Sequence, residues 1–276
     1  MAAQVSFSVE SPRGSGTVSV ESERMGDGEP LLLLHGIGHH WQAWQPVLEI
    51  LAAEREVIAV DLPGFGASPA LPDDFAYDLA TVVPVLGALC EALDLDRPHV
   101  AGNSLGGLLA LEMGRGKLAR SVTALSPAGF WTESERRYAF GTLLAMRQGA
   151  ESMPLSMIEW LSRSPAGRAA LTSTIYARPG RRSPEAVVAE TLALRGATGF
   201  RRTLAAGRQV LFQDDVPGLP VTIAWGTRDR LLLRRQGVRA KRAVPAARLV
   251  RLPGCGHVPM SDDPALVARV LLDGSR

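Results

Sequence analysis

The first half of the chain carries four short apolar runs, each ending in Gly, Pro, Asp or Ser and separated from the next by a stretch of helical character. They are LLLLHG (31–36), EVIAVDLPG (56–64), HVAGNS (99–104) and SVTALSPAG (121–129). Apolar strands that alternate with helices are typical of parallel strands buried on both faces. The pattern therefore predicts an α/β protein with a mostly parallel sheet.

Other elements can be read around this framework. The alternating segments VSFSVE (5–10) and GTVSVES (16–22) predict an antiparallel hairpin, with the Gly-Ser-Gly at 14–16 as its turn. Apolar periodicity predicts helices over 44–53, 77–93 and 106–114. A closing helix follows Asp263, which we expect to be its N-cap, with Pro264 in the first turn.

The stretch from 130 to 215 breaks the alternation, because it is helical and Arg-rich and contains no buried-strand run. The strand-like segments PVTIAWG (220–226) and RLVRLPG (248–254) then resume the sheet. We therefore expect a core of residues 1–129 and 216–276 with a helical lid, or cap, inserted at 130–215. The alternative is a helical decoration on the edge of the sheet.

The composition is that of an ordinary globular protein, with 46% hydrophobic and 21% charged residues in a chain of 276. A net charge of +2 gives no reason to expect a nucleic acid or a membrane as partner. No signal peptide or membrane-spanning run is recognisable, so we expect a cytoplasmic protein, and the Ala-, Arg- and Gly-rich composition suggests a bacterial source. The oligomeric state stays open.

Two cysteines, Cys90 and Cys255, are too few for a disulfide framework and lack zinc-ligand spacing. We expect both to be packing residues, with a reactive thiol at Cys255 as the alternative. The adjacent His39 and His40 lack further ligands at usable spacing, so we expect no metal and no cofactor.

Gly102-Asn103-Ser104-Leu105-Gly106 lies where a predicted buried strand turns directly into a helix. Such a tight turn strains its central residue, and the glycines two positions away allow the flanking backbones to approach. The turn would present Ser104 Oγ at a helix N-terminus, where backbone amides stabilise developing negative charge. Ser104 is therefore the candidate nucleophile.

A serine hydroxyl needs an oriented base, and His257 follows the strand-like RLVRL in a Gly- and Pro-bounded loop. His99 begins a strand, at the opposite edge of the sheet. Asp229 follows VTIAW in the same way and is the candidate acid that orients the base. Asp61 precedes the serine in a turn where we expect its carboxylate to cap local amides.

Two further aspartates, Asp214 and Asp215, precede their strand and should lie at the wrong edge. For the oxyanion we expect the backbone amides of Ile37 and Leu105 to be the donors. Pocket-lining candidates come from the loops around these positions: His35, Gly36, Trp41, Trp44, Phe130, Trp131 and Val258.

Five ordered motifs resemble the α/β-hydrolase fold family over nearly the whole chain: HGIGHHWQAW, DLPGFGAS, GNSLGG, WGTRDRL and GCGHVPMSDDP. The resemblance implies an eight-stranded, mostly parallel sheet with a lid after the sixth strand. It also implies a cofactor-independent triad with Ser104 as nucleophile, Asp229 as acid and His257 as base. The amides of Ile37 and Leu105 would form the oxyanion hole.

A serine nucleophile excludes epoxide opening and halide displacement, since attack on alkyl carbon would leave a dead-end ether. What remains is attack on an acyl or ketone carbonyl in a small, largely apolar substrate. Ester or lactone hydrolysis leads, followed by carbon–carbon bond hydrolysis beside a ketone and by cofactor-free perhydrolysis. A non-catalytic ligand-binding scaffold is the alternative from another class.

The predicted lid is rich in arginine, and we expect most of these side chains to form a solvated helical face. A second hypothesis is that one of them points inward and binds a substrate carboxylate. These arginines include Arg136, Arg137, Arg147, Arg163, Arg168, Arg178, Arg181, Arg182, Arg195, Arg201 and Arg202.

Overall fold

The computed structural model describes residues 3–11 and 14–276, and one eight-stranded sheet runs through them. The strand order is β1-β2-β4-β3-β5-β6-β7-β8. The strands are β1 (Ala3–Ser11), β2 (Gly14–Met25), β3 (Pro30–Leu34), β4 (Glu56–Val60), β5 (His99–Asn103), β6 (Ser121–Leu125), β7 (Val221–Gly226) and β8 (Arg248–Leu252).

Strands β3 to β8 are parallel, and β1 and β2 are antiparallel to their neighbours, so the predicted mostly parallel sheet is confirmed. The four apolar runs of the first half supply the four central strands β4, β3, β5 and β6, whose residues are almost all buried. This is the burial expected for parallel strands covered on both faces.

The predicted hairpin exists, but its turn is not the Gly-Ser-Gly. Gly14 pairs with Ser11, and Gly16 pairs with Val9, so all three residues belong to β2. The remaining two residues of the connection, 12 and 13, lie outside the described part of the chain. A Cβ on Gly16 would lie 3.1 Å from the ring of Phe75, so this glycine serves close packing.

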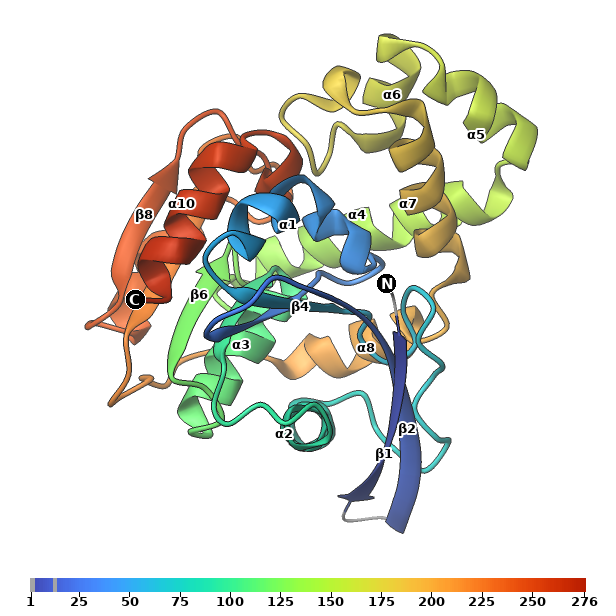
Figure 1. Ribbon diagram of the computed structural model, residues 1–276. Helices are drawn as coiled ribbons and strands as arrows, with labels where there is room; N and C mark the ends of the chain where they lie inside the picture. The colour runs from blue at the N-terminus through green and yellow to red at the C-terminus, as the bar shows by residue number, and fades with distance from the viewer. Residues whose placement is uncertain (1–2, 12–13) are drawn as a thin grey trace.

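Helices cover both faces of the sheet, with α1 and α10 packed together on one side and α2 and α3 on the other (Figure 1). The Asp263 carboxylate caps α10 as expected, by accepting a hydrogen bond from the Leu266 amide. The helices of the core are α1 (Gln45–Ala52), α2 (Leu79–Ala92), α3 (Leu105–Arg115), α9 (Arg235–Ala243) and α10 (Pro264–Gly274).

Five further α-helices lie between β6 and β7, and no described residue between these two strands is itself in a strand. Among them, α5 and α6 stand furthest from the sheet, at the upper right of Figure 1. These inserted helices are α4 (Glu133–Ser152), α5 (Leu155–Ser162), α6 (Pro165–Thr172), α7 (Pro184–Gly196) and α8 (Phe200–Ala206).

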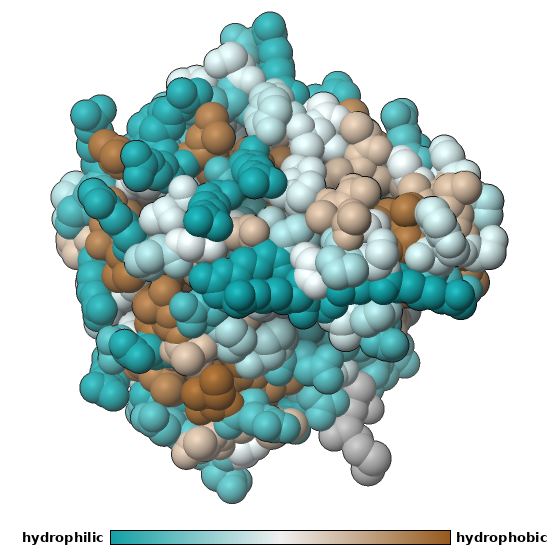
Figure 2. Space-filling view, turned by 90° about the horizontal axis from the view of Figure 1, so that it is seen from above, coloured by the Kyte–Doolittle hydropathy of each residue, from teal (hydrophilic) through white to brown (hydrophobic). Residues whose placement is uncertain are grey.

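The surface is largely hydrophilic on the face shown in Figure 2, where apolar residues occur in small separate groups. Among the described residues, no helix combines the length and the apolar character needed to cross a membrane.

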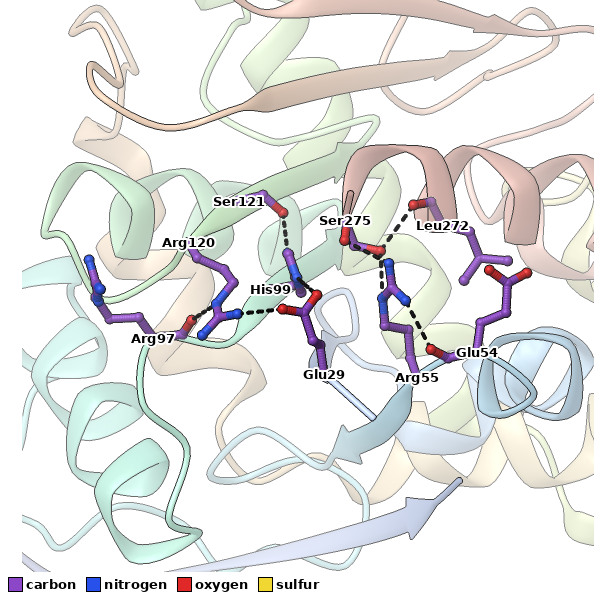
Figure 3. A network of polar contacts seen from close by, with 9 residues as sticks. All are labelled: Glu29, Glu54, Arg55, Arg97, His99, Arg120, Ser121, Leu272 and Ser275. Atoms are coloured by element: carbon purple, nitrogen blue, oxygen red, sulfur yellow. Dashed lines mark hydrogen bonds and ion pairs between the residues drawn. The ribbon is translucent and has the colours of Figure 1, made fainter. Parts of the chain in front are cut away.

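A polar network occupies the amino edge of the sheet (Figure 3). The Glu29 carboxylate accepts a hydrogen bond from Arg120 at 2.8 Å and lies 3.2 Å from His99 Nε2 at the start of β5. Nearby, the Arg55 guanidinium donates to the Ser275 carbonyl at 2.8 Å. His99 therefore belongs to the edge opposite to the loops that carry Ser104 and His257, as the sequence indicated.

Candidate active site

Ser104 lies between β5 and α3 with φ 56° and ψ −113°, a conformation that a residue with a side chain rarely adopts. The two glycines make this turn possible. A Cβ on Gly102 would lie 2.0 Å from the Gly106 carbonyl oxygen, and one on Gly106 would lie 2.1 Å from the Leu34 carbonyl oxygen. The strand and the helix can therefore pack this closely only with glycine at both positions.

His257 and Asp229 form a buried pair after β8 and β7. His257 Nδ1 donates to Asp229 Oδ2 at 2.8 Å, and the other carboxylate oxygen accepts from the amides of Leu231 and Leu232 at 2.9 and 2.8 Å. The Asp229 side chain has no exposed surface. These amides fix the carboxylate, which in turn fixes the imidazole with Nε2 as the nitrogen free to accept a proton.

Ser104 and His257 line the same cavity. Among the described residues, no hydrogen bond joins the Ser104 hydroxyl to His257, and this hydroxyl does not cap α3. Catalytic hydrogen bonds often form only when substrate binds.

The amides of Ile37 and Leu105 have no acceptor within the described part of the chain, whereas the Ser104 amide donates to the Leu125 carbonyl. Ile37 lines the cavity, and Leu105 is the first residue of α3, whose amides point toward its N-terminus. The loop after β3 approaches the serine closely, since a Cβ on Gly36 would lie 3.2 Å from Ser104 Cβ. Two amides without an acceptor therefore lie in segments that adjoin Ser104.

The cavity has a volume of about 440 Å³ and lies between the carboxyl ends of the strands and helices α4, α6 and α7. Its lining is mainly apolar, with several threonines. Of the predicted lining residues, Gly36 and Val258 contribute to it. No cluster of three or more His, Cys, Asp or Glu that could hold a metal ion occurs in residues 3–11 and 14–276.

Three of the predicted lining residues lie between β3 and α1 and do not line the cavity. His35 is fully buried, where its Nδ1 donates to the Gly36 carbonyl at 2.7 Å and its Nε2 accepts from the Leu62 amide at 2.9 Å. The short helical turn Trp41–Trp44 directs the chain away from the cavity, so that Trp44 is buried and Trp41 packs against the core.

Phe130 and Trp131 are also absent from the lining. The Phe130 ring packs on Phe212, with ring centroids 5.3 Å apart. Trp131 Nε1 donates to the Val210 carbonyl at 3.0 Å. Both aromatic residues therefore hold the segment that leads into β7, and the prediction that they line the pocket is wrong.

The other candidates for acid and thiol chemistry have structural roles. Asp61 accepts hydrogen bonds from the amides of Trp41 at 2.6 Å and Ala67 at 2.7 Å, which is the local capping that the sequence indicated. Burial raises the pKa of Cys255 to about 12, and it raises that of Cys90 to the same value. Neither thiol is a reactive thiolate near neutral pH.

Asn103 is a positioning residue that the sequence did not reveal. Its side-chain amide is buried and donates to the Leu125 carbonyl at 3.1 Å and to the His257 carbonyl at 2.9 Å. It therefore ties the histidine loop to the residue before Ser104. Its place inside the serine motif was the only signal in the sequence.

Asp262 is a second such residue. Its carboxylate accepts from the amide of Gly256 at 2.8 Å in the histidine loop, and from those of Ala177 at 3.0 Å and Arg178 at 2.8 Å in the inserted segment. One side chain therefore joins the loop that carries His257 to the chain between α6 and α7.

The expectation that most of the arginines form a solvated face is wrong. Five of the eleven are exposed, and the other six are buried or half-buried. Arg168, for example, donates to the carbonyls of Ser162 and Gly180 at 2.7 and 2.8 Å. Three of these guanidinium groups, those of Arg147, Arg168 and Arg195, satisfy carbonyl groups at the ends of helices, where no backbone partner is available. The less exposed six are Arg136, Arg147, Arg168, Arg182, Arg195 and Arg202.

Comparison with known proteins identifies the family. A model of the alpha/beta hydrolase family matches residues 31–270. The chain belongs to this family, and several of its relatives are named as hydrolases or esterases.

Among the sequence relatives, an uncharacterised protein of Mycobacterium tuberculosis is 30% identical over 254 residues, which cover 87% of this chain and 73% of that protein. A pimeloyl-[acyl-carrier protein] methyl ester esterase of Aeromonas hydrophila is 41% identical over 96 residues, 35% of this chain and 36% of the esterase.

Solved structures share the fold. An esterase from Thermogutta terrifontis superimposes with a TM-score of 0.76 at 18% identity, covering 98% of this chain and 97% of the esterase. A meta-cleavage product hydrolase from Pseudomonas fluorescens gives a TM-score of 0.72 at 19% identity, with 93% of both chains covered.

Proposed function

We propose that the protein is a cofactor-independent serine hydrolase that cleaves an ester or lactone of a small, largely apolar substrate through an acyl-enzyme on Ser104. The observation that carries this proposal is the strained Ser104 in one cavity with His257, whose Nδ1 is held by the buried Asp229. Residues 130–215 serve as the lid over this cavity.

In the proposed reaction, Ser104 Oγ attacks the carbonyl carbon while His257 Nε2 takes its proton. The negative charge on the carbonyl oxygen is stabilised by the amides of Ile37 and Leu105. His257 then returns the proton to the leaving oxygen, and water attacks the acyl-enzyme by the reverse of these steps. Asp229 holds the imidazole in the required tautomer throughout. The step requires Ser104 and His257 to come into contact in the substrate complex.

Covalent labelling tests the proposal directly. A fluorophosphonate should add one phosphonyl group to the wild-type protein, located by peptide mass spectrometry at Ser104, and the Ser104→Ala variant should not react. Hydrolysis of p-nitrophenyl acetate should fall by roughly 10⁴-fold or more in kcat in the same variant. A wild-type protein that binds the probe without covalent reaction would instead be a ligand-binding scaffold.

The bond that is cleaved is then identified with a substrate panel. The panel contains p-nitrophenyl esters, lactones and a vinylogous diketone, all assayed with the purified protein. Ester or lactone turnover with a higher kcat/KM than for the diketone supports the proposal. The reverse order would favour carbon–carbon bond hydrolysis.

A further inference from the structure

Three residues that line the cavity are also exposed at the surface of the protein. Ala145 and Gly149 belong to α4, and Ala170 belongs to α6. The other lining residues are buried or half-buried. Because a residue that borders both the cavity and the solvent marks an opening, the cavity opens to the outside between α4 and α6. We call this opening, between Ala145, Gly149 and Ala170, the mouth.

The packing of the inserted helices leaves room for the mouth. Helix α7 packs against α4, α5 and α6, whereas α4 and α6 make little or no contact with each other. The three residues of the mouth are small, and a Cβ on Gly149 would meet no atom within 4 Å. No side chain therefore fills the space beside Gly149.

The insertion is packed closely onto the core along its other borders. A Cβ on Gly38, in the loop after β3, would lie 2.5 Å from the Leu194 side chain of α7. A Cβ on Gly256, in the histidine loop, would lie 2.7 Å from the backbone nitrogen of Ala177. These contacts close the cavity along α7 and along the segment that follows α6. The mouth is therefore the route that the packing leaves to Ser104.

The end of α4 that carries Gly149 is held in place from α7. The Arg195 guanidinium donates to the Ala150 carbonyl at 2.7 Å and also to the Met153 carbonyl. Met153 follows α4 directly and lines the cavity. The mouth is therefore framed by a fixed helix end, and it is open without any movement of the insertion.

The side chains inside the mouth suit an apolar chain. Leu143, Met146 and Leu171 are among them, and burial against such side chains stabilises hydrocarbon. The acidic side chain in the lining, Glu190, is already paired with Arg182. No arginine lines the cavity within the described part of the chain. The hypothesis that an inward-pointing arginine binds a substrate carboxylate therefore finds no support.

We infer that substrate enters through the mouth, and that the missing side chain at Gly149 lets an apolar chain longer than the cavity extend into solvent while the scissile carbonyl lies at Ser104. This inference rests on the function proposed above and extends its substrate class to esters with a long apolar chain. The cavity of about 440 Å³ limits the substrate near the scissile bond, and the mouth leaves the far end free. Gly149 therefore determines specificity and takes no part in the chemistry.

Reversible blocking of the mouth tests this inference. Cys90 and Cys255 are buried, and burial raises the pKa of each to about 12, so a cysteine introduced at an exposed position is the more reactive thiol. Benzyl methanethiosulfonate would attach a bulky group to Gly149→Cys through a disulfide that dithiothreitol removes. Gly141→Cys is the matched control. Gly141 is an exposed glycine of the same helix with no atom within 4 Å of its Cβ, and it lies outside the cavity lining.

Each variant is compared before and after modification. Benzylation of Gly149→Cys should lower kcat/KM for p-nitrophenyl decanoate by about tenfold or more, mainly through KM, with a smaller loss for p-nitrophenyl acetate. Dithiothreitol should restore the activity, which separates blocking from misfolding. Benzylation of Gly141→Cys should change neither value. The inference is overturned if the two modifications affect the decanoate equally, if acetate loses as much as decanoate, or if the wild type hydrolyses acetate and not decanoate.

A probe with a tail tests whether the far end of the chain reaches solvent. A decyl fluorophosphonate should label wild-type Ser104 at a rate within roughly threefold when its chain ends in a polyethylene glycol–biotin tail that exceeds the cavity. A loss of tenfold or more with the tail would contradict the inference. If Ser104-dependent turnover is present and these effects are absent, the inference fails and the proposed function stands. If Ser104 neither reacts with the probes nor supports turnover, both fail.

Discussion

The two sides of the cavity are held in different ways. We call the carboxyl ends of β3, β5, β7 and β8 with their loops the floor, and the cavity-lining parts of α4, α6 and α7 the roof. In the floor, glycines such as Gly102 allow backbone contacts, and the amides of Leu231 and Leu232 hold Asp229.

In the roof, long arginine side chains hold neighbouring helices together. Arg147 of α4 donates to the carbonyls of Leu194 and Ala197 at the end of α7, and Arg195 of α7 donates to the Ala150 carbonyl of α4 at 2.7 Å. Backbone contacts tolerate few substitutions, whereas arginine clamps can be replaced one at a time. The floor is therefore suited to fixed chemistry and the roof to variable substrate choice.

Asp229→Asn gives the largest effect expected from the floor. The Asn carbonyl would remain on the amides of Leu231 and Leu232, so its NH₂ group would face His257 Nδ1 and force the proton onto Nε2. We expect kcat to fall by roughly 10⁴-fold for every substrate, with KM little changed. Steady-state kinetics on several esters measure this. Asp214→Asn, an exposed change at the opposite edge, should be neutral, and a substrate-dependent loss in Asp229→Asn would contradict a purely chemical role.

The floor should also become less stable in acid. Burial lowers the pKa of His35 from 6.5 to about 4. The unfolded chain therefore binds more protons in this range, and stability is lost as pH falls from about 6.5 toward 4. We expect the free energy of unfolding to drop by about 3 kcal/mol from His35 alone. Burial also lowers the pKa of His39, His40 and His99, which act in the same direction.

Urea denaturation at a series of pH values measures this slope. His35→Gln should be less stable than the wild type at pH 7 and should show a shallower dependence on pH, because it has no proton to gain. The prediction fails if the variant keeps the wild-type slope.

The smallest effect is expected in the roof. Arg195→Ala removes the clamp on the end of α4, including its bond to the Ala150 carbonyl, and should lower the free energy of unfolding by about 1–2 kcal/mol. KM should rise more for bulky esters than for acetate, with kcat for acetate nearly unchanged. Arg163→Ala, in which an exposed arginine is removed, is the matched control. If Arg195→Ala lowered kcat for every ester, including acetate, the roof would affect the chemical step as well as the choice of substrate.

The sequence predicted the floor well because its determinants are local. A buried strand that ends in Gly-x-Ser-x-Gly and continues as a helix fixes the backbone around Ser104, and the parallel order brings the strand ends to one edge. Asp61 was likewise assigned correctly to a turn from its neighbours alone. The prediction of a turn at Gly-Ser-Gly (14–16) was wrong because glycine also allows close packing, here of Gly16 against Phe75.

The roof could not be predicted from the sequence, because its determinants are contacts between residues far apart in the chain. Whether Arg147 is solvated depends on which helix end lies beside it, and that is decided by packing between helices far apart in the chain. His39 and Glu190 lie close together although they come from two such distant segments, and Glu190 belongs to no motif. Trp44 and Trp131 were predicted to be pocket walls because they lie in segments that follow predicted strands, yet the core buries both.

The carboxylate of Asp262 bears on how such enzymes can be recombined. It belongs to the chain segment after β8, yet two of its three amide partners, Ala177 and Arg178, lie in the insertion. A chimera that exchanges only the contiguous insertion would break this junction beside His257, the proposed base. An exchange that moves Asp262 and its loop together with the insertion would transfer a complete physical unit, which is not contiguous in the sequence.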